Sequence, residues 1–523
     1  MKQDDRSRDR PALPKGGPIV YGPGGGASAL GVPFVGLPLN AFGKRALRWL
    51  LLGHRWLGIV FALVFAVWFL SGAVMMYVGF PRLSEAERRA ALPPLALPSL
   101  ALPAGMIGPD AALTAAGLAG PPARIDLGML GDAPVYRVSA LDGTRTTVLA
   151  ADGRVIDRVD PALLLTIAKN HPAARAVEDL GTVTWDQWSV PQRFNPLRPF
   201  RLVALGDAAG TRLYLSERTG EVVLDTTATE RFWNWLGAVP HWIYLTPLRA
   251  EPALWRDVVL WVSGIAIAVA VSGYILGLSR LRLKPRYATG RTTPYRGVSA
   301  WHHLGGLLGG TALLTFIVSG WLSMNPNRWF SPTMPDAAAL ARYAGAETAP
   351  FRFDSAEAAR LCPDLKEVRF TQSGGVPVAR ALCGQAPPRP CCGGTAPDPD
   401  ALARALTTLM PGERAPRIER IAAEDAYWYG DRETRPLPVL RAVFADPAAT
   451  WVHVDPDTGE ILGRMDRSNR ASRWLFNGLH TLDFARLPRP AWDAVMLLWL
   501  SAGFLVAATG TVIGWRRLKR RFG

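Results

Sequence analysis

Four long stretches without a charged residue constrain the fold of this chain more than any other feature. They are residues 57–78, 258–278, 304–322 and 494–514. A helix needs about 20 apolar residues to cross the hydrocarbon core of a bilayer, and each stretch has that length. The sequence therefore predicts an integral membrane protein with four transmembrane helices.

Basic residues flank these stretches and predict their orientation. The chain has 59 Lys and Arg against 43 Asp and Glu, a net charge of +16. Such a charge would suit nucleic acid if it formed one basic face. Here the basic residues gather before the first stretch, between the second and third, and after the fourth. By the positive-inside rule, both termini and the central link are cytoplasmic, so we expect contact with membrane lipid and none with nucleic acid.

The two long segments between paired stretches are then extracytoplasmic. Each ends in a strand-like alternation around a Thr-Gly-Glu turn, at residues 219–221 and 458–460, which predicts a β-hairpin. All four cysteines lie in the second segment, where disulfides are chemically allowed: Cys362, Cys383, Cys391 and Cys392. We expect one or two disulfides, with the pairing left open.

Matched spacings predict that one half of the chain occurs twice. His54 lies 17 residues before the pair Ser71-Gly72, and His302 lies 17 residues before Ser319-Gly320. The second and fourth stretches each contain a further pair of this kind, Ser272-Gly273 and Thr509-Gly510.

The turn glycines repeat in the same way. Gly220 lies 21 residues before His241, and Gly459 lies 21 residues before His480. Since each half has an even number of spans, the repeat is parallel and its pseudo-twofold axis runs along the membrane normal. Matching residues then share a depth and can face one another.

The expected fold is a membrane α+β protein: four transmembrane helices in two tandem parallel repeats, each with an α+β domain inserted between its two helices. The expected boundaries are a mobile cytoplasmic tail (1–43), helix 1 (44–79), domain 1 (80–230), an interfacial segment with helix 2 (231–282), a basic link (283–300), helix 3 (301–324), domain 2 (325–470), an interfacial segment with helix 4 (471–515) and a basic tail (516–523). The Gly-rich piece at 22–31 lacks a preceding strand, so we interpret it as linker rather than a dinucleotide loop.

Four of the seven histidines fall at the repeated membrane-edge positions. An imidazole there can relay protons, bind a metal, ligate haem or simply hydrogen-bond at the interface. Pairing by symmetry favours ligation: His54 with His302 near the cytoplasmic surface, and His241 with His480 near the opposite surface. Two facing imidazoles can bind one haem iron from opposite sides, so two pairs predict two haems stacked across the bilayer.

Several alternatives remain open at this point. His303 can replace His302 as a ligand, and Met76 and Met324 can supply thioether ligands near the outer surface. A structural zinc site fits less well, because it needs four converging nitrogen or sulfur ligands. Glycines beside His302 make room either for a macrocycle or for a neighbouring helix: Gly305, Gly306, Gly309 and Gly310.

The remaining groups carry less weight. His171 and His453 lie in the extracytoplasmic segments, and the strand position of His453 favours packing over ligation. The aromatic groups at 185–188 and 427–429 form either a binding surface for a bulky ligand or, as we favour, domain packing.

Several motifs resemble the PepSY-associated membrane proteins. They are His-Arg-Trp-Leu-Gly at 54–58, Trp-His-His at 301–303, the Ser-Gly pairs, the Thr-Gly-Glu hairpins, and residues 474–483 with His480. The resemblance covers the chain from about residue 44 onward. It implies a multi-pass protein of the bacterial inner membrane whose PepSY-type domains face the periplasm.

Better understood members of that family are similar to dihaem ferrisiderophore reductases. The resemblance therefore implies an electron-transfer protein with two b-type haems that reduces a ferric siderophore or another ferric chelate for iron uptake. No nicotinamide or flavin motif is present, so the electron donor is expected to be a quinol or a reductase protein. The rival hypothesis is a non-redox PepSY scaffold that binds a periplasmic peptidase or another partner. A permease is disfavoured, because the chain has only four spans and no charged residue inside them.

Overall fold

The computed structural model of the chain describes residues 41–95, 106–284, 286–345, 349–392, 397–430 and 435–522. The predicted tail at 1–43 and its Gly-rich piece at 22–31 fall outside the described residues, apart from the last three tail positions. Those three already belong to a helix, because α1 begins at Ala41.

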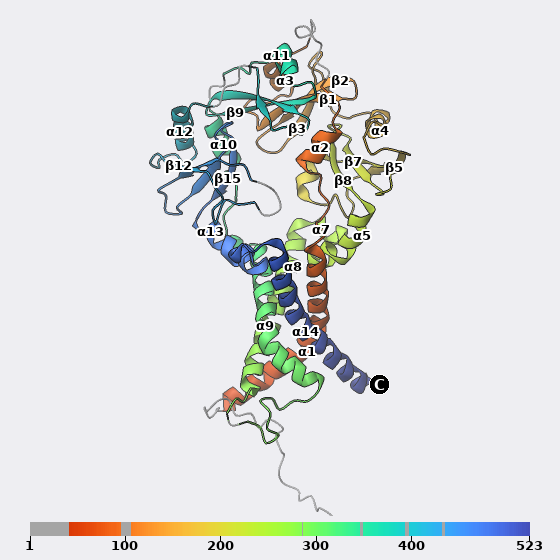
Figure 1. Cartoon of the computed structure of the whole chain (residues 1–523), viewed down its shortest axis with the longest axis vertical. Helices are drawn as coiled ribbons and strands as arrows, with labels where there is room; N and C mark the ends of the chain where they lie inside the picture. Colours follow the sequence, from red (N-terminus) through yellow and green to blue (C-terminus); the bar gives the residue numbers. More distant parts are fainter. Residues whose placement is uncertain are drawn as a thin grey trace, which may run out of the picture.

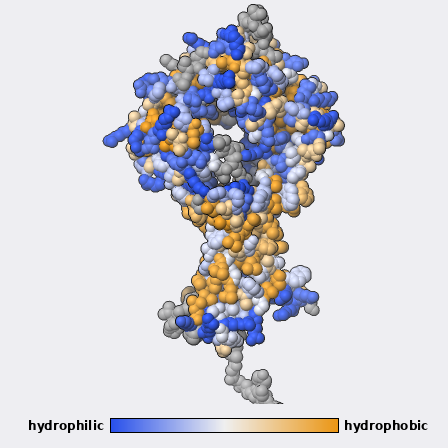
Figure 2. All heavy atoms as spheres, viewed as in Figure 1, coloured by the Kyte–Doolittle hydropathy of each residue, from blue (hydrophilic) through white to orange (hydrophobic). Residues whose placement is uncertain are grey.

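Four long helices form a stalk. They are α1 (Ala41–Met75), α8 (Pro252–Arg280), α9 (Val298–Ser323) and α14 (Arg489–Phe522). Three predicted spans lie wholly in them, and the first, 57–78, runs three residues past the end of its helix. Among the described residues, these four are the helices long and apolar enough to cross a membrane. Figure 2 shows the apolar surface gathered on the stalk, with polar residues at its far end and over the rest of the molecule.

The stalk helices pack closely through small residues. A Cβ atom on Gly309 of α9 would overlap the backbone oxygen of Ala502 on α14, and one on Gly310 would meet the ring of Tyr274 on α8 at 3.1 Å. These two glycines therefore serve helix packing. Gly306 differs, because a Cβ there would meet nothing within 4 Å.

Above the stalk lies a head of three antiparallel sheets (Figure 1). The first four-stranded sheet contains β5 (Glu178–Val183), β6 (Phe200–Ala204), β7 (Arg212–Ser216) and β8 (Val222–Thr226). The second contains β12 (Arg417–Ile421), β13 (Val439–Val443), β14 (Trp451–Val454) and β15 (Ile461–Met465). These two sheets stand on opposite sides of the head, and Figure 2 shows that the head is hollowed between them.

A seven-stranded sheet joins the two sides at the end farthest from the stalk (Figure 1). Its order is β11-β10-β9-β1-β2-β3-β4, from β1 (Arg124–Leu130), β2 (Ala133–Ser139), β3 (Arg145–Leu149), β4 (Val155–Ile156), β9 (Leu365–Ser373), β10 (Val376–Cys383) and β11 (Arg389–Pro390). The junction is antiparallel, with Ile125 opposite Phe370. Arg369 and Asp126 form an ion pair across it at 2.7 Å. The two predicted domains therefore share one sheet and one core.

Short helices cover the sheets and connect them to the stalk. In the head they are α2 (Glu85–Ala91), α3 (Pro109–Ala115), α4 (Pro161–Lys169), α10 (Ala337–Ala344), α11 (Ser355–Leu361) and α12 (Pro399–Thr407). At the junction with the stalk are α5 (Ala228–Leu236), α6 (Ala238–His241), α7 (Thr246–Arg249), α13 (Arg467–Arg473) and a π-helical turn at Trp474–Gly478. Phe232 and Trp235 of α5 are more than half exposed. Exposed aromatic rings at this level suit a membrane–water interface.

Both predicted hairpins are confirmed. β7 pairs with β8 and β14 with β15, each across a Thr-Gly-Glu turn. The turn glycines have positive φ values, +71° at Gly220 and +68° at Gly459. A Cβ at either position would overlap the seven-stranded sheet, at Leu130 in the first case and Ser373 in the second. Glycine is therefore required both by the backbone conformation and by the space available.

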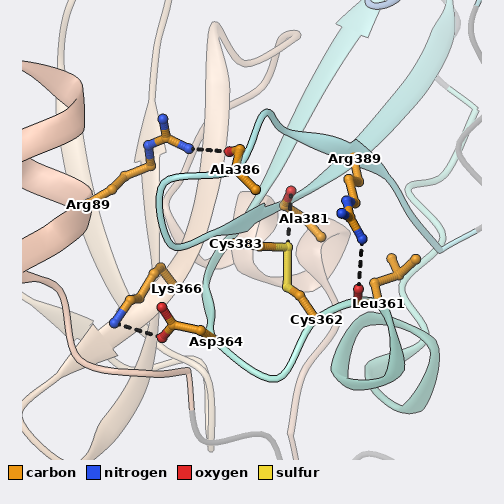
Figure 3. The surroundings of a disulfide bond; sticks show 9 residues. All are labelled: Arg89, Leu361, Cys362, Asp364, Lys366, Ala381, Cys383, Ala386 and Arg389. Atoms are coloured by element: carbon orange, nitrogen blue, oxygen red, sulfur yellow. Dashed lines mark hydrogen bonds and ion pairs between the residues drawn. A yellow bond between two sulfur atoms is a disulfide. The ribbon is translucent and has the colours of Figure 1, made fainter.

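All four cysteines lie in the second half of the head. Cys362 and Cys383 form a disulfide that links α11 to the end of β10 (Figure 3). Cys391 and Cys392 are buried and not joined, although their sulfur atoms lie 2.6 Å apart. The expectation of one or two disulfides is thus met by one.

Candidate functional site: two histidine pairs in the stalk

The four membrane-edge histidines meet as two pairs. The rings of His54 on α1 and His302 on α9 have centroids 6.4 Å apart. The rings of His241, at the end of α6, and His480, after the π-helical turn, have centroids 6.2 Å apart. The structure therefore brings together the partners that the spacings predicted.

These separations suit two imidazoles on one metal ion. A metal–imidazole bond is about 2.0 Å long, and the ring centroid lies about 1.2 Å behind the nitrogen, so two rings on opposite sides of one ion have centroids about 6 Å apart. Among the described residues, no third His, Cys, Asp or Glu joins either pair. Two protein ligands are enough for a haem iron, because the porphyrin supplies the other four.

The inner pair, His54 and His302, is held through Nδ1. His54 Nδ1 lies 3.1 Å from the carbonyl oxygen of Val269 on α8. His302 Nδ1 lies 3.2 Å from the carbonyl oxygen of Val506 on α14. A carbonyl only accepts hydrogen bonds, so Nδ1 carries the proton in both rings and Nε2 keeps its lone pair. This tautomer is the one that binds a metal through Nε2.

The outer pair, His241 and His480, is held in the same way. His241 Nδ1 lies 3.1 Å from the carbonyl oxygen of Trp68 on α1. His480 Nδ1 lies 2.9 Å from Ser319 Oγ on α9. Ser319 Oγ itself donates to the carbonyl of Thr315 at 2.6 Å, so its oxygen accepts from His480. Both outer rings thus also present an unprotonated Nε2.

His303 is arranged differently. Its Nδ1 lies 2.8 Å from Thr293 Oγ1, and its Nε2 lies 2.8 Å from the carbonyl oxygen of Gly277. Both ring nitrogens are therefore hydrogen-bonded at the end of the stalk that carries the basic link. Its ring packs edge-on against Tyr295 rather than facing His54.

A cavity of about 790 Å³ surrounds the outer pair. This volume lies within the range of sites that enclose small-molecule ligands and cofactors. Met76 and Met324 form part of its wall, together with aromatic residues of α1 and α9. Its lining also includes polar side chains, of which Glu424 and Tyr429 come from the head, together with Asp483, Arg486 and Arg489.

The inner pair has space beside it on both partner helices. Gly58 lies one turn beyond His54, and Gly306 lies one turn beyond His302. A Cβ at either glycine would meet nothing within 4 Å. A flat ligand can therefore approach the backbone of α1 and α9 next to the two imidazoles.

The two pairs lie at different levels of the stalk. His54 and Ser71, which contacts His241, are 17 residues apart on α1, which corresponds to roughly 25 Å of helix. Aromatic rings occupy the core between the levels: Phe61, Phe65, Phe69 and Phe316. Phe316 packs edge-on against His480, with ring centroids 5.5 Å apart.

The Ser/Thr-Gly pairs are the site residues that sequence reasoning missed. They served only as landmarks of the repeat, yet each lies directly against one histidine. The hydroxyl groups of Ser71, Ser272, Ser319 and Thr509 lie 2.9–3.3 Å from Nδ1 of His241, His54, His480 and His302, respectively. The signal that could have found them is their fixed distance from the histidines in both halves.

The other flagged residues lie in the head. His453 is buried and stacked on Trp428, with ring centroids 4.6 Å apart, and its Nε2 accepts a hydrogen bond from Arg441. His171 Nδ1 accepts from the backbone of Ala173. Trp188 and Trp428 are buried and serve packing, Trp185 is half exposed, and Tyr429 lines the cavity around the outer pair.

Comparison with known proteins identifies one relationship. The family model described as "PepSY-associated TM region" matches residues 51–379, more than half of the chain. No curated protein matches.

Proposed function

Because the chain belongs to the family of PepSY-associated transmembrane proteins, we propose that it is a dihaem electron-transfer protein of the bacterial inner membrane. Both termini lie in the cytoplasm, and the head lies in the periplasm. The two halves are tandem parallel repeats, each with one PepSY-type domain. One b-type haem is held by His54 and His302, and the other by His241 and His480.

One observation carries this proposal: two pairs of imidazoles lie at a ligating separation, and each ring is hydrogen-bonded through Nδ1, which leaves the Nε2 lone pair for a metal. Bound haem would supply one-electron redox chemistry at two depths of the membrane. The chain's own contribution is to fix the four rings, to exclude water from the stalk core, and to form a cavity around the outer pair that residues of the head help to line. His303, Met76 and Met324 are not needed as ligands.

The electron acceptor is a ferric chelate, of which a ferric siderophore is the best-fitting example. One electron converts the bound Fe³⁺ to Fe²⁺, which the chelator holds more weakly. The donor is a quinol or a reductase protein on the side of the basic link. Outer-sphere transfer requires proximity and a suitable potential but no acid, base or nucleophile, in agreement with a cavity wall dominated by aromatic and aliphatic side chains.

The test is single-turnover reduction of a ferric chelate. Purified protein is reduced with dithionite, freed of excess reductant and mixed with a ferric siderophore in the presence of a ferrous-specific chelator. We expect the haem band to reoxidise and one ferrous ion to appear per electron released. The His480→Ala variant should reoxidise more slowly, and His171→Ala, altered in the head, serves as the control.

Two results would contradict the proposal. A haem band that stays reduced in the presence of ferric chelates would exclude the reductase activity while leaving the haems in place. A colourless protein, purified from cells that make haem, would favour the scaffold that binds a peptidase or another periplasmic partner.

A further inference from the structure

The four Ser/Thr-Gly pairs share one arrangement. In each pair the hydroxyl oxygen donates to a carbonyl of its own helix, as Thr509 Oγ1 does to Leu505 at 2.7 Å and Ser272 Oγ does to Val269 at 2.8 Å. With its proton used in this way, the oxygen presents a lone pair to the histidine Nδ1–H of another segment. The same geometry recurs at four sites on four helices.

The glycine of each pair makes room for the imidazole ring. A Cβ at Gly273 would lie 2.6 Å from His54 Cε1, and one at Gly510 would lie 3.2 Å from His302 Cε1. At Gly72 and Gly320 the corresponding distances to His241 and His480 are 3.4 and 3.6 Å. Any side chain at Gly273 or Gly510 would therefore push the ring away from the neighbouring hydroxyl.

We propose that these pairs are positioning devices in which the hydroxyl of Ser71, Ser272, Ser319 or Thr509 orients one imidazole and sets the reduction potential of the iron it binds. This inference rests on the proposed haem ligation. Hydrogen bonding at Nδ1–H increases the electron donation of the imidazole to the metal, which stabilises the ferric over the ferrous state. At His54, His241 and His302 a backbone carbonyl shares Nδ1–H with the hydroxyl. Loss of the hydroxyl therefore weakens the hydrogen bonding at Nδ1 without removing it, and should raise the potential.

Thr509 offers the sharpest test, because two small substitutions distinguish the effect of losing the hydroxyl group from the effect of changing the side-chain volume. Thr509→Val removes the hydroxyl and keeps the shape, whereas Thr509→Ser keeps the hydroxyl. Thr511→Val is the matched control, since Thr511 lies on the same helix and its hydroxyl bonds only the Ala507 carbonyl in the described structure. Haem content and spectroelectrochemical titration of the full-length protein in detergent are the readouts.

We expect Thr509→Val to retain both haems and to shift the ferric-to-ferrous equilibrium of one by about tenfold, or about 59 mV for one electron, toward the ferrous state. Thr509→Ser and Thr511→Val should titrate as wild type does. Ser319→Ala should produce a larger shift in the other haem, because its 2.9 Å contact is the shortest of the four.

Full haem content with unchanged potentials in Thr509→Val and Ser319→Ala would overturn the inference and leave the proposed function standing. Equal shifts in Thr509→Val and Thr511→Val would also overturn it, because the effect would then be general to α14. Wild-type protein without haem would instead remove the proposed function itself.

Discussion

At the level of single residues, a hydroxyl group on a distant helix lies against each of the four stalk imidazoles. The pairs His54 with His302 and His241 with His480 followed from spacing, because equal spacing places matching residues at one depth. The hydroxyl acceptors and the engagement of His303 did not follow. A helical repeat fixes the level of a side chain, whereas the direction of its ring depends on neighbouring helices that are more than 150 residues away in the chain.

Replacing the glycines beside the histidines should reduce haem binding to different extents, because the space beside each ring differs. Gly273→Ala places a Cβ 2.6 Å from His54 Cε1, a distance that real contacts essentially never show, so the His54 ring must move. Gly320→Ala places its Cβ 3.6 Å from His480 Cε1, an ordinary van der Waals contact. We expect Gly273→Ala to lose about half of the haem and Gly320→Ala to keep all of it, as measured by haem absorbance per chain. Equal retention in both variants would contradict this assignment.

At the scale of elements, the spans and both hairpins were predictable, whereas the seven-stranded sheet was not. Charge-free length identifies a membrane helix, and a Thr-Gly-Glu turn between alternating strands identifies a hairpin, because both signals are local. The pairing of β1 with β9 joins two segments that are separated in the sequence by the long helices α8 and α9. Strand patterns indicate which face is buried but not which distant strand lies alongside, so the sequence predicted two domains that in the structure share a sheet.

Strand β14 gives a prediction about pH. Burial of His453, together with the Arg441 cation beside it, lowers the pKa of His453 to about 3 from its ordinary 6.5. Between these two values the unfolded chain binds a proton that the folded chain does not, so the stability of the head falls as the pH drops from 6.5 toward 3.

The variant His453→Gln keeps an acceptor for Arg441 but cannot titrate. Its thermal midpoint, followed by near-ultraviolet circular dichroism, should decline less steeply than that of the wild type between pH 7 and pH 4. The comparison rests on the two slopes, since the substitution also changes the absolute stability. Parallel slopes would mean that His453 does not contribute to the pH dependence.

At the scale of the whole molecule, we propose that the head and the stalk together form one path for electrons. The seven-stranded sheet ties the two halves together far from the stalk. The two imidazole pairs lie at levels separated by roughly 25 Å of helix α1. Residues of the head form part of the wall of the cavity around the outer pair. This arrangement suits a path for electrons from the basic end of the stalk to an acceptor below the sheets. It depends entirely on two haems being present.

Haem stoichiometry in the pair of variants His302→Ala and His303→Ala tests that dependence most directly. The two substitutions are adjacent and chemically identical, but only His302 faces His54, whereas both nitrogens of His303 bond the protein. Our account predicts two haems per chain in the wild type, about one in His302→Ala and two in His303→Ala. No haem in the wild type, or equal loss in the two variants, would contradict it.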